Sequence, residues 1–351
     1  MTTESPEPSV DAPPFGLFFG DARELFDPDF TETPTLTSVD PHDRALANFS
    51  VFDLGYIRGD GIFEAAGVVN SVPLAWRLHL ERLAMSAEMV ELPVPNISAL
   101  AAFTDAAIGA TAAMSGDDVV EQAMVKLMVS RGADSWLSAA PSELLGVGAT
   151  PDAPLPTVVV MVDCNRHERP TEAGIVTLAR EHLKDTASRS PWLLLGAKTL
   201  SYATNMAAKR EYERRGAQNA VFVTLDGYVM EGPQSSVVLR EGDRLITPDP
   251  GIGILHGTTQ QELFAWGALA KRYEVAYEDI TEDRLRTADQ IWIMGGGGVQ
   301  SVTSIDGEPI KWVEGSAEEI NAFLRTERAA IDAWTAENGL ARSQADAALS
   351  S

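Results

Sequence analysis

The sequence predicts an α+β fold divided into about two domains. Helical periodicity and short strand-like runs alternate along the chain, but without the regular strand–helix–strand order of a doubly wound parallel sheet. The chain has 351 residues, and roughly 150 residues form a typical domain. A polar, proline-containing stretch at residues 163–171 is typical of a linker. We therefore expect a small α/β domain at 15–162 and a larger one at 172–340.

Both ends of the chain have the composition of flexible tails. Residues 1–14 are rich in proline, serine, threonine and acidic residues, and residues 341–351 are rich in alanine and serine. Such segments hold too few apolar side chains to offset the entropy lost on ordering. We expect both tails to be disordered.

In the N-terminal half, strand patterns precede and follow a pair of helices. An apolar run predicts a strand at 62–69, with a turn at Asn70-Ser71. Apolar residues at helical spacing predict a helix at 76–90, and a second helix is expected at 97–114. Two more strands are expected at 124–129 and 156–162.

The C-terminal half contains more strands than helices. Strands are expected at 174–179, 221–225, 228–230, 236–240, 245–247, 291–294 and 299–304, and helices at 202–215 and 259–273. Asp226-Gly227 favours a two-residue type I′ hairpin turn. Gly216 is suited to end the first of these helices.

Composition and charge narrow the class of protein. Hydrophobic residues make up 45% of the chain and the formal net charge is −24, which argues against nonspecific binding to nucleic acid or to anionic membranes. The single cysteine, Cys164, excludes a disulfide framework, and the five histidines lack zinc-ligand spacing. The first twenty residues lack a basic region, and no apolar run approaches the roughly 20 residues that span a bilayer. We expect a soluble, cytoplasmic protein without a metal.

Two charged residues occupy positions in the sequence that would suit a catalytic or cofactor-binding role. Lys198 lies among small and apolar residues just before a predicted helix, and an apolar setting lowers the pKa of an amine and frees it to act as nucleophile or base. Glu231 follows a predicted strand at a Gly-Pro break, where a carboxylate can hold a protonated ring nitrogen of a cofactor. Taken singly, each residue type is more often found exposed to solvent.

Two further segments suit an anion. Thr258 and Thr259 precede a predicted helix, whose N-terminal amides and dipole can bind phosphate; alternatively a threonine simply caps the helix. His79, Arg82 and Ser86 share one face of the helix at 76–90. A buried Arg82 could clamp a phosphate, although such a face is more often solvated.

The order of these segments resembles fold type IV of the pyridoxal-phosphate enzymes, the D-amino-acid aminotransferase-like fold. That family includes branched-chain aminotransferases, D-amino-acid aminotransferases and aminodeoxychorismate lyases. The similarity extends from about Asp53 to Gly307 and is carried by RGDGIFE (58–64), HLERLAMSA (79–87), VKLMVSRG (125–132), KTLSYATNMAAKRE (198–211), DGYVMEG (226–232), LHGTTQQ (255–261), ADQIWIMGGGG (288–298) and SIDG (304–307).

The resemblance implies a role for each matching residue. Lys198 would be the Schiff-base lysine and Glu231 the partner of the pyridine nitrogen of pyridoxal 5'-phosphate. The resemblance further implies a homodimer with the cofactor held mainly by the second domain. Further cofactor contacts would come from Arg82, Tyr202, Ser236, Thr258, Thr259 and Gly296, and substrate contacts from Phe63, Lys126 and Gly297.

Three departures from the family pattern affect the finer contacts. Ser236 stands where the family often has asparagine, and the Gly295–Gly298 run replaces a Gly-Thr phosphate contact. Glycine still leaves backbone N–H groups open to an anion. The stretch before Asp53 is longer than in most members of the family.

The strand at 124–129 discriminates best between the reactions of the family. Branched-chain aminotransferases that resemble this chain carry Tyr-x-Arg where Met124 and Lys126 stand, and Ala133 to Trp136 offer no carboxylate-binding cation. A lysine there resembles some aminodeoxychorismate lyases; alternatively Lys126 is a solvated residue at a strand edge. We expect a 4-amino-4-deoxychorismate lyase of folate biosynthesis, acting on an amino substrate that carries carboxylate. A class IV aminotransferase and a cofactor-binding protein without turnover are the alternatives.

Overall fold

The computed structural model describes residues 14–39, 52–133, 155–165, 170–269, 273–296, 298–326 and 330–331. The helices are α1 (Ala22–Leu25), α2 (Leu54–Arg58), α3 (Trp76–Met89), α4 (Ile97–Met114), α5 (Thr186–Arg189), α6 (Ala203–Arg214), α7 (Thr258–Leu269), α8 (Glu282–Thr287) and α9 (Ser316–Thr326), with 3₁₀ turns η3 (Pro191–Leu193) and η4 (Pro250–Ile252). The strands are β1 (Phe15–Gly20), β2 (Leu36–Ser38), β3 (Gly61–Val69), β4 (Val72–Pro73), β5 (Gln122–Ser130), β6 (Thr157–Asp163), β7 (Glu172–Arg180), β8 (Asn219–Thr224), β9 (Ser236–Glu241), β10 (Arg244–Pro248), β11 (Glu274–Glu278), β12 (Gln290–Gly295), β13 (Gly298–Ile305) and β14 (Glu308–Pro309). The predicted α+β class is confirmed.

The chain divides into two units that alternate along the sequence. The first unit comprises Met1–Ile57, Glu64–Leu74 and Pro95–His167, and the second comprises Arg58–Phe63, Ala75–Val94 and Glu168–Ser351. The division expected from the linker at 163–171 assigned α3 to the first domain, whereas α3 groups with the second unit. The side chains of α3 explain this grouping, because His79 and Arg82 bond to Thr258 and His256 at the start of α7.

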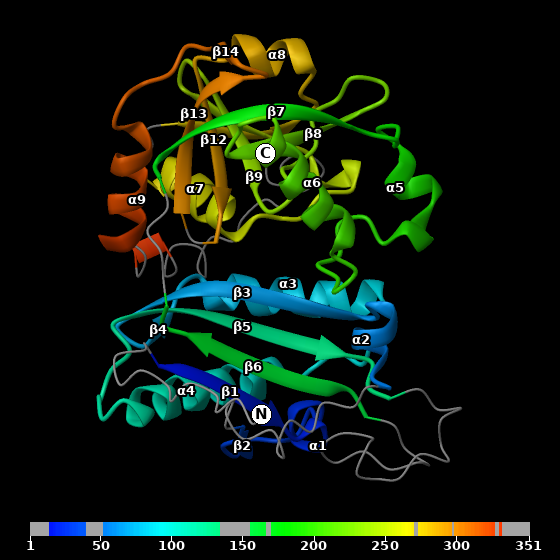
Figure 1. Cartoon of the computed structure of the whole chain (residues 1–351), viewed down its shortest axis with the longest axis vertical. Helices are drawn as coiled ribbons and strands as arrows, with labels where there is room; N and C mark the ends of the chain where they lie inside the picture. Colours follow the sequence, from blue (N-terminus) through cyan, green and yellow to red (C-terminus); the bar gives the residue numbers. More distant parts are fainter. Residues whose placement is uncertain are drawn as a thin grey trace, which may run out of the picture. The chain divides into compact units, whose positions relative to one another are not determined.

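The first unit is built on a six-stranded sheet in the order β2-β1-β6-β5-β3-β4. Helix α4 packs on β1 and β6 (Figure 1). In β5 the side chains of Val125, Leu127 and Val129 are buried, whereas those between them are half-buried. This alternation is expected of a strand whose two faces meet different environments.

The turn from β3 to β4 has the geometry that the sequence favours. Asn70 and Ser71 both have positive φ, at 49° and 62°. Two consecutive left-handed residues define a type I′ turn, which matches the twist of an antiparallel pair. The predicted turn is therefore confirmed.

The second unit is built on an eight-stranded mixed sheet in the order β11-β10-β9-β12-β13-β7-β8, with β14 pairing with β13. Strands β7 and β8 are parallel, as are β13 and β7, whereas β9, β12 and β13 run antiparallel. Trp292 and Met294 belong to the core cluster under α7 and α9, and Ile291 and Ile293 to the cluster that contains Leu285 of α8. The sheet of the second unit thus has helices on both faces (Figure 1).

The predicted hairpin at 221–230 differs from the structure in its turn. Leu225, Asp226 and Gly227 form a three-residue loop, closed by Thr224 N–H donating to the carbonyl of Tyr228 at 2.8 Å. Gly227 has φ +85°. A three-residue loop that ends in a left-handed glycine is the next common hairpin connection. The predicted two-residue type I′ turn was wrong. In place of the predicted strand at 228–230, Tyr228 and Val229 form isolated bridges.

Helix α4 is the one described helix long and apolar enough to cross a membrane by length and composition. Its 18 residues include Phe103 and Leu100, which are fully buried. Helices in the core of a globular domain pass the same test, and α4 packs on the sheet of the first unit as such a helix does.

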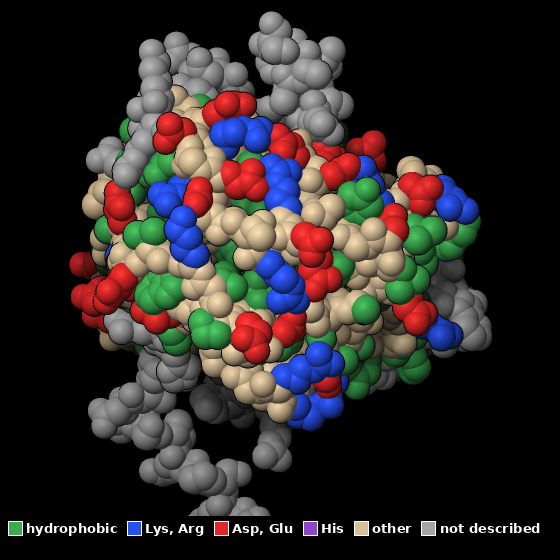
Figure 2. Space-filling model, turned by 90° about the horizontal axis from the view of Figure 1, so that it is seen from above, with side chains coloured by type: hydrophobic (Ala, Val, Ile, Leu, Met, Phe, Trp, Pro, Cys, Tyr) green, Lys and Arg blue, Asp and Glu red, His purple; other side chains and the backbone are tan. Residues whose placement is uncertain are grey.

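On the face seen in Figure 2, acidic and basic side chains lie next to one another. Ion pairs between neighbouring side chains also occur among the described residues, for example Arg286 with Glu282 at 2.7 Å and with Asp306 at 2.5 Å. No continuous basic surface of the kind that binds nucleic acid is visible on this face.

Candidate active site

The site is assembled from residues of the second unit that lie far apart in the sequence. Lys198 lies between η3 and α6, outside any helix or strand. Its backbone pairs with the start of β3, where Phe63 N–H donates to the carbonyl of Lys198 at 3.0 Å. Its Nζ lies 4.6 Å from the centre of the Phe63 ring. A short bridge and an aromatic contact thus hold the lysine.

Helix α3 presents three buried polar side chains on one face. His79, Arg82 and Ser86 are 6%, 8% and 1% exposed, so the face is not solvated. Arg82 donates to the carbonyl of His256 at 2.7 Å, and His79 Nε2 lies 3.2 Å from Thr258 Oγ1. These contacts bring the guanidinium to the residues that precede α7.

The N-terminus of α7 has the features of an anion seat. The helix begins at Thr258, one residue earlier than predicted, so Thr258 and Thr259 are its first two residues rather than its cap. The first amides of a helix have no partner within it, and they carry the positive end of the helix dipole. A Cβ on Gly257 would lie 2.0 Å from Ser236 Oγ. The absence of a side chain at Gly257 therefore lets the Ser236 hydroxyl pack against the residue that precedes α7.

The carboxylate of Glu231 is held in a setting that favours its neutral form. Burial raises its pKa to about 7, opposed by a 3.0 Å hydrogen bond from the Leu255 N–H and by the positive charges of Arg180, Lys198 and Arg82. Carboxyl groups removed from water gain a proton more readily. A cationic ring nitrogen placed against Glu231 would compensate for this burial.

Tyr202 and Phe63 lie beside the lysine. Their rings meet edge to face with centres 5.3 Å apart, and the Tyr202 hydroxyl donates to the carbonyl of Pro233 at 3.0 Å. Burial, reinforced by the charge of Glu231, raises the pKa of Tyr202 to about 12. The phenol is therefore neutral and can donate a hydrogen bond.

The predicted residue Gly296 directly follows β12. Gly295 pairs with Gly298, and a Cβ on Gly295 would lie 2.4 Å from the carbonyl oxygen of Gln234. Gly296 has φ +60°, a left-handed conformation that glycine adopts without strain. Gly297 lies outside the described residues.

Lys126 belongs to the first unit. It lies on β5, which pairs with β6 on one side and β3 on the other, so it does not lie at a sheet edge. It is half-buried, opposite Met161 in the register. Burial lowers the pKa of Lys126.

Arg180 is a residue near the site that the sequence did not point to. It ends β7, and its guanidinium carbon lies 5.0 Å from the centre of the Phe222 ring. Phe222 N–H donates to the carbonyl of Glu231 at 2.9 Å, so Arg180 lies over the residue that pairs with Glu231. The two charges are 51 positions apart, and no local spacing could have linked them.

A cavity of about 660 Å³ lies elsewhere in the second unit, at the ends of β7 and β8, lined among others by Thr177, Val223 and Glu282. None of the predicted site residues lines it. Within the residues that the structure describes, no three His, Cys, Asp or Glu side chains are grouped to hold a metal ion.

Comparison with known proteins identifies the family. The model of the amino-transferase class IV family matches residues 61–305, so the chain belongs to this family. The chain is therefore a pyridoxal-phosphate-dependent enzyme of the lyase or aminotransferase type, with fold type IV.

The relatives carry more particular names. The chain is 33% identical over 287 residues to the bifunctional aminodeoxychorismate lyase / D-amino acid transaminase of Mycobacterium tuberculosis, covering 79% of this chain and 93% of that protein. A fold IV transaminase from Curtobacterium pusillum matches with a TM-score of 0.75 and 31% identity over 89% of this chain and 99% of that one. A PLP-bound hypothetical aminotransferase from Mycobacterium tuberculosis matches with a TM-score of 0.69 and 28% identity, again over 89% and 99% of the two chains.

The geometry of the second unit fits pyridoxal phosphate. The cofactor has an aldehyde, a phosphate and a pyridine nitrogen, and the chain offers a lysine amine, a helix N-terminus with an arginine, and a buried carboxylate. The Ser236 hydroxyl, which packs against Gly257, adds a polar group beside the start of α7.

Proposed function

We propose that the chain is a 4-amino-4-deoxychorismate lyase, which releases p-aminobenzoate and pyruvate in folate biosynthesis. The single observation that carries the proposal is the pair Met124 and Lys126 on β5, where related branched-chain aminotransferases carry Tyr-x-Arg. A flexible ammonium suits a substrate with two carboxylates, because it binds as a point charge rather than in one planar geometry. The name of the 33%-identical relative, which includes both activities, supports the same choice.

The environment of Lys126 supports a binding role over a purely solvated one. Its neighbours Val125 and Leu127 are fully buried on the other face of the sheet, and Met124 and Met128 flank it on its own face. A half-buried ammonium among thioethers is poorly hydrated, which strengthens its attraction to a carboxylate.

The proposed chemistry assigns one task to each residue. When bound, pyridoxal phosphate supplies an electron sink next to the substrate nitrogen. Lys198 Nζ, as a free amine, removes the proton from C4 of the substrate and delivers a proton to the departing enolpyruvyl oxygen. Glu231 holds the ring nitrogen charged, and Arg82 with the Thr258 and Thr259 amides holds the phosphate.

Tyr202 is proposed to lie near the cofactor's phenolic oxygen. Its one hydroxyl hydrogen, which the Pro233 carbonyl accepts in the structure, would turn to donate to that oxygen, and its raised pKa keeps the hydroxyl neutral. Ser236 and Gly296 are proposed to lie along the phosphate, and Phe63 and Gly297 to contact substrate.

We propose that the chain works as a cytoplasmic homodimer, as the family resemblance implies. Large apolar side chains on the surface of the second unit support association. Trp192 of η3 is 73% exposed and Leu193 is 44% exposed. A tryptophan is costly to leave in water and is enriched in protein interfaces.

The decisive experiment measures p-aminobenzoate and pyruvate released from enzymatically generated 4-amino-4-deoxychorismate. We expect stoichiometric release by the wild type and none by Lys198→Ala, in which borohydride also fails to fix the cofactor to the chain. Unchanged activity of Lys198→Ala would refute the assignment of the lysine.

The aminotransferase alternative is tested with the same protein. The bifunctional name of the relative supports it directly. If the protein binds its cofactor but releases no p-aminobenzoate, a screen of amino donors with keto acids identifies the aminotransferase. Conversion of a keto acid at a rate that rivals elimination would make the chain bifunctional.

A further inference from the structure

Three hydrogen bonds hold the backbone of the segment that contains Lys198, two to the start of β3 and one to α3. Phe63 N–H donates to the Lys198 carbonyl at 3.0 Å, and Leu200 N–H donates to the carbonyl of Gly61 at 2.8 Å. The third bond runs from the Lys198 N–H to Ser86 Oγ at 3.1 Å. Of the three, this is the bond whose acceptor is a side chain.

Ser86 is buried and lies on the helix that carries the phosphate arginine. It is 1% exposed, so its hydroxyl is shielded from water. It follows Arg82 by four residues on α3, and residues at this spacing share one face of a helix. One helix face therefore contacts both the segment before α7, through Arg82, and the lysine, through Ser86.

We propose that Ser86 is a positioning residue for Lys198. By accepting the lysine's backbone N–H, its hydroxyl fixes the point from which the Lys198 side chain extends. It does so from the same rigid helix that carries Arg82, so the amine and the phosphate clamp keep a constant separation. The proposal rests on the proposed function of Lys198, but its first test does not.

The physical reason is the strict geometry that lysine chemistry needs. Reactive groups must be held within about 0.5 Å of the productive position by supporting contacts. Lys198 lies in a segment without regular secondary structure, so neither a helix nor a strand ladder supplies that support. Without the hydroxyl, the half-buried amide of Lys198 loses its acceptor and the segment gains freedom.

The first test measures amide hydrogen exchange at Lys198 in the full-length protein, with and without pyridoxal phosphate. In Ser86→Ala we expect exchange at Lys198 to be about tenfold faster, whereas exchange at Leu200, whose acceptor is the Gly61 carbonyl, stays unchanged. Ser86→Cys keeps a weak acceptor of similar size, and we expect an intermediate rate.

The matched control is Ser301→Ala. Ser301 lies on β13, is also 1% exposed, and its hydroxyl pairs with that of Ser316 at 2.9 Å. The Ser301→Ala substitution removes an equally buried hydroxyl from the second unit and leaves the hydrogen bonds of the Lys198 segment intact. We expect normal exchange at Lys198 in this variant.

The second test uses the visible absorbance of the cofactor-loaded protein. The visible absorbance band of the bound cofactor is followed as the pH is varied. In Ser86→Ala the pH at the midpoint of its change should shift by about half a unit or more, because the Lys198 amine is displaced. In Ser301→Ala the midpoint should equal that of the wild type. Wild-type exchange at Lys198 in both Ser86 variants, or an equal shift in Ser301→Ala, overturns the proposal. If Lys198→Ala proves active, the proposed function fails, and exchange alone decides whether Ser86 holds this segment.

Discussion

The ionised carboxylate of Glu231 lowers the stability of the cofactor-free fold, and the size of this effect depends on pH. Burial raises its pKa to about 7 from the ordinary 4.5. Below about pH 4.5 the carboxyl is protonated in both folded and unfolded chains, so it contributes no difference. As the pH rises towards 7 the unfolded chain releases its proton first, and the cofactor-free protein becomes less stable.

We therefore predict that Glu231→Gln stabilises the cofactor-free protein at pH 8 but not at pH 4.5. The gain at pH 8 is at most about 3 kcal/mol, the free-energy equivalent of the pKa shift. Urea unfolding at both pH values measures it, with the exposed Glu213→Gln as control. An equal effect of Glu231→Gln at the two pH values would contradict the raised pKa. The same variant should lose cofactor affinity, since the ring nitrogen loses its anionic partner.

Gly257 provides a second prediction at the scale of single residues. Its missing side chain leaves room that Ser236 fills, since a Cβ would lie 2.0 Å from Ser236 Oγ and 2.9 Å from Ser236 Cβ. Overpacking of this kind costs about 1–3 kcal/mol. We predict that Gly257→Ala weakens cofactor binding about tenfold or more.

A double-mutant cycle isolates this clash. Adding Ser236→Gly removes the two atoms that lie within 3.0 Å of the new methyl group. Since Ser236 is itself a proposed phosphate contact, we expect the double variant to lose less affinity than the sum of the two single losses. Equilibrium dialysis against pyridoxal phosphate measures all four proteins. Purely additive losses would show that Gly257 acts otherwise than through Ser236.

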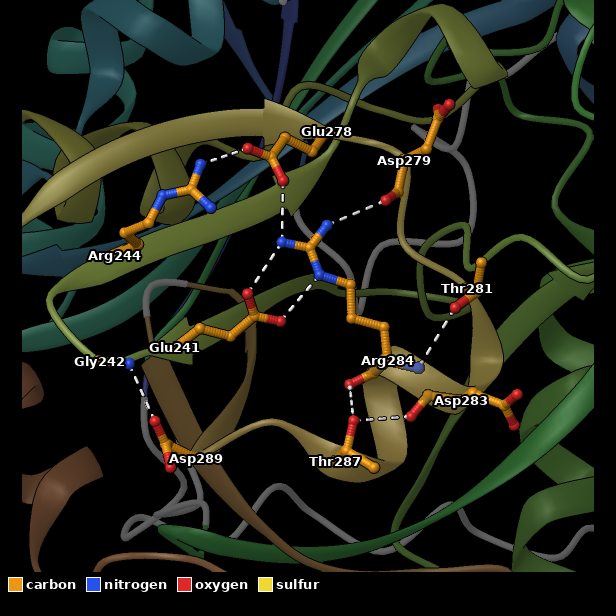
Figure 3. A network of polar contacts seen from close by, with 10 residues as sticks. All are labelled: Glu241, Gly242, Arg244, Glu278, Asp279, Thr281, Asp283, Arg284, Thr287 and Asp289. Carbon is orange, nitrogen blue, oxygen red and sulfur yellow. Dashed lines mark hydrogen bonds and ion pairs between the residues drawn. The ribbon is translucent and has the colours of Figure 1, made fainter.

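At the scale of elements, Arg284 connects α8 to two strands (Figure 3). Its guanidinium binds both oxygens of Glu241 on β9, at 2.8 and 2.9 Å, and Glu278 on β11 at 2.8 Å. Arg244 on β10 also binds Glu278. These contacts raise the pKa of Arg284, so it remains charged at every pH at which the protein folds.

We predict that Arg284→Met destabilises the protein by about 1–3 kcal/mol, because two partly buried carboxylates lose a shared partner. The control is Arg77→Met, which breaks an exposed pair with Glu81 within α3 and should cost less than about 0.5 kcal/mol. Thermal unfolding at low and high salt measures both. Equal losses of stability in Arg284→Met and Arg77→Met would show that the contacts of Arg284 with Glu241 and Glu278 contribute no more than an exposed ion pair.

The elements themselves could be predicted where periodicity was strong. The helices at 76–90 and 97–114, and the strands at 236–240 and 291–294, appear within one or two residues of their predicted bounds. Helix α8 was not predicted, because its six residues are mostly charged and show no apolar periodicity. Helix α9 carried a signal that was missed, since Ala317, Ile320 and Leu324 recur at helical spacing and are buried.

The site could be predicted only in its residue types. The motifs indicated which side chains matter, but their burial depends on contacts between distant segments. From the sequence alone, the face of α3 that carries Arg82 and Ser86 is expected to be exposed to solvent. It is buried because the start of α7 and the Lys198 segment supply its partners. Arg180 next to Glu231 needed the sheet register to be known.

At the scale of the whole molecule, all of the described residues proposed to hold the cofactor come from the second unit. Ligands stabilise the folded part that they bind. We predict that adding pyridoxal phosphate slows amide exchange in α3, α7 and the Lys198 segment about tenfold or more, and changes β1 and β6 of the first unit much less. Exchange read by mass spectrometry, with and without cofactor, measures this difference. Equal protection of both units would contradict the assignment of the cofactor to the second.

The alternation of the two units along the chain has a consequence for synthesis on the ribosome. The chain passes between units after residues 57, 63, 74, 94 and 167. Helix α3 therefore emerges long before the Lys198 segment and the start of α7, which supply its bonding partners. Domains made of one continuous segment can fold as they emerge, N-terminal first, but this second unit cannot close until nearly all of the chain has been translated. The face of α3 that is buried in the folded protein therefore remains uncovered until the C-terminal half of the chain has been synthesised.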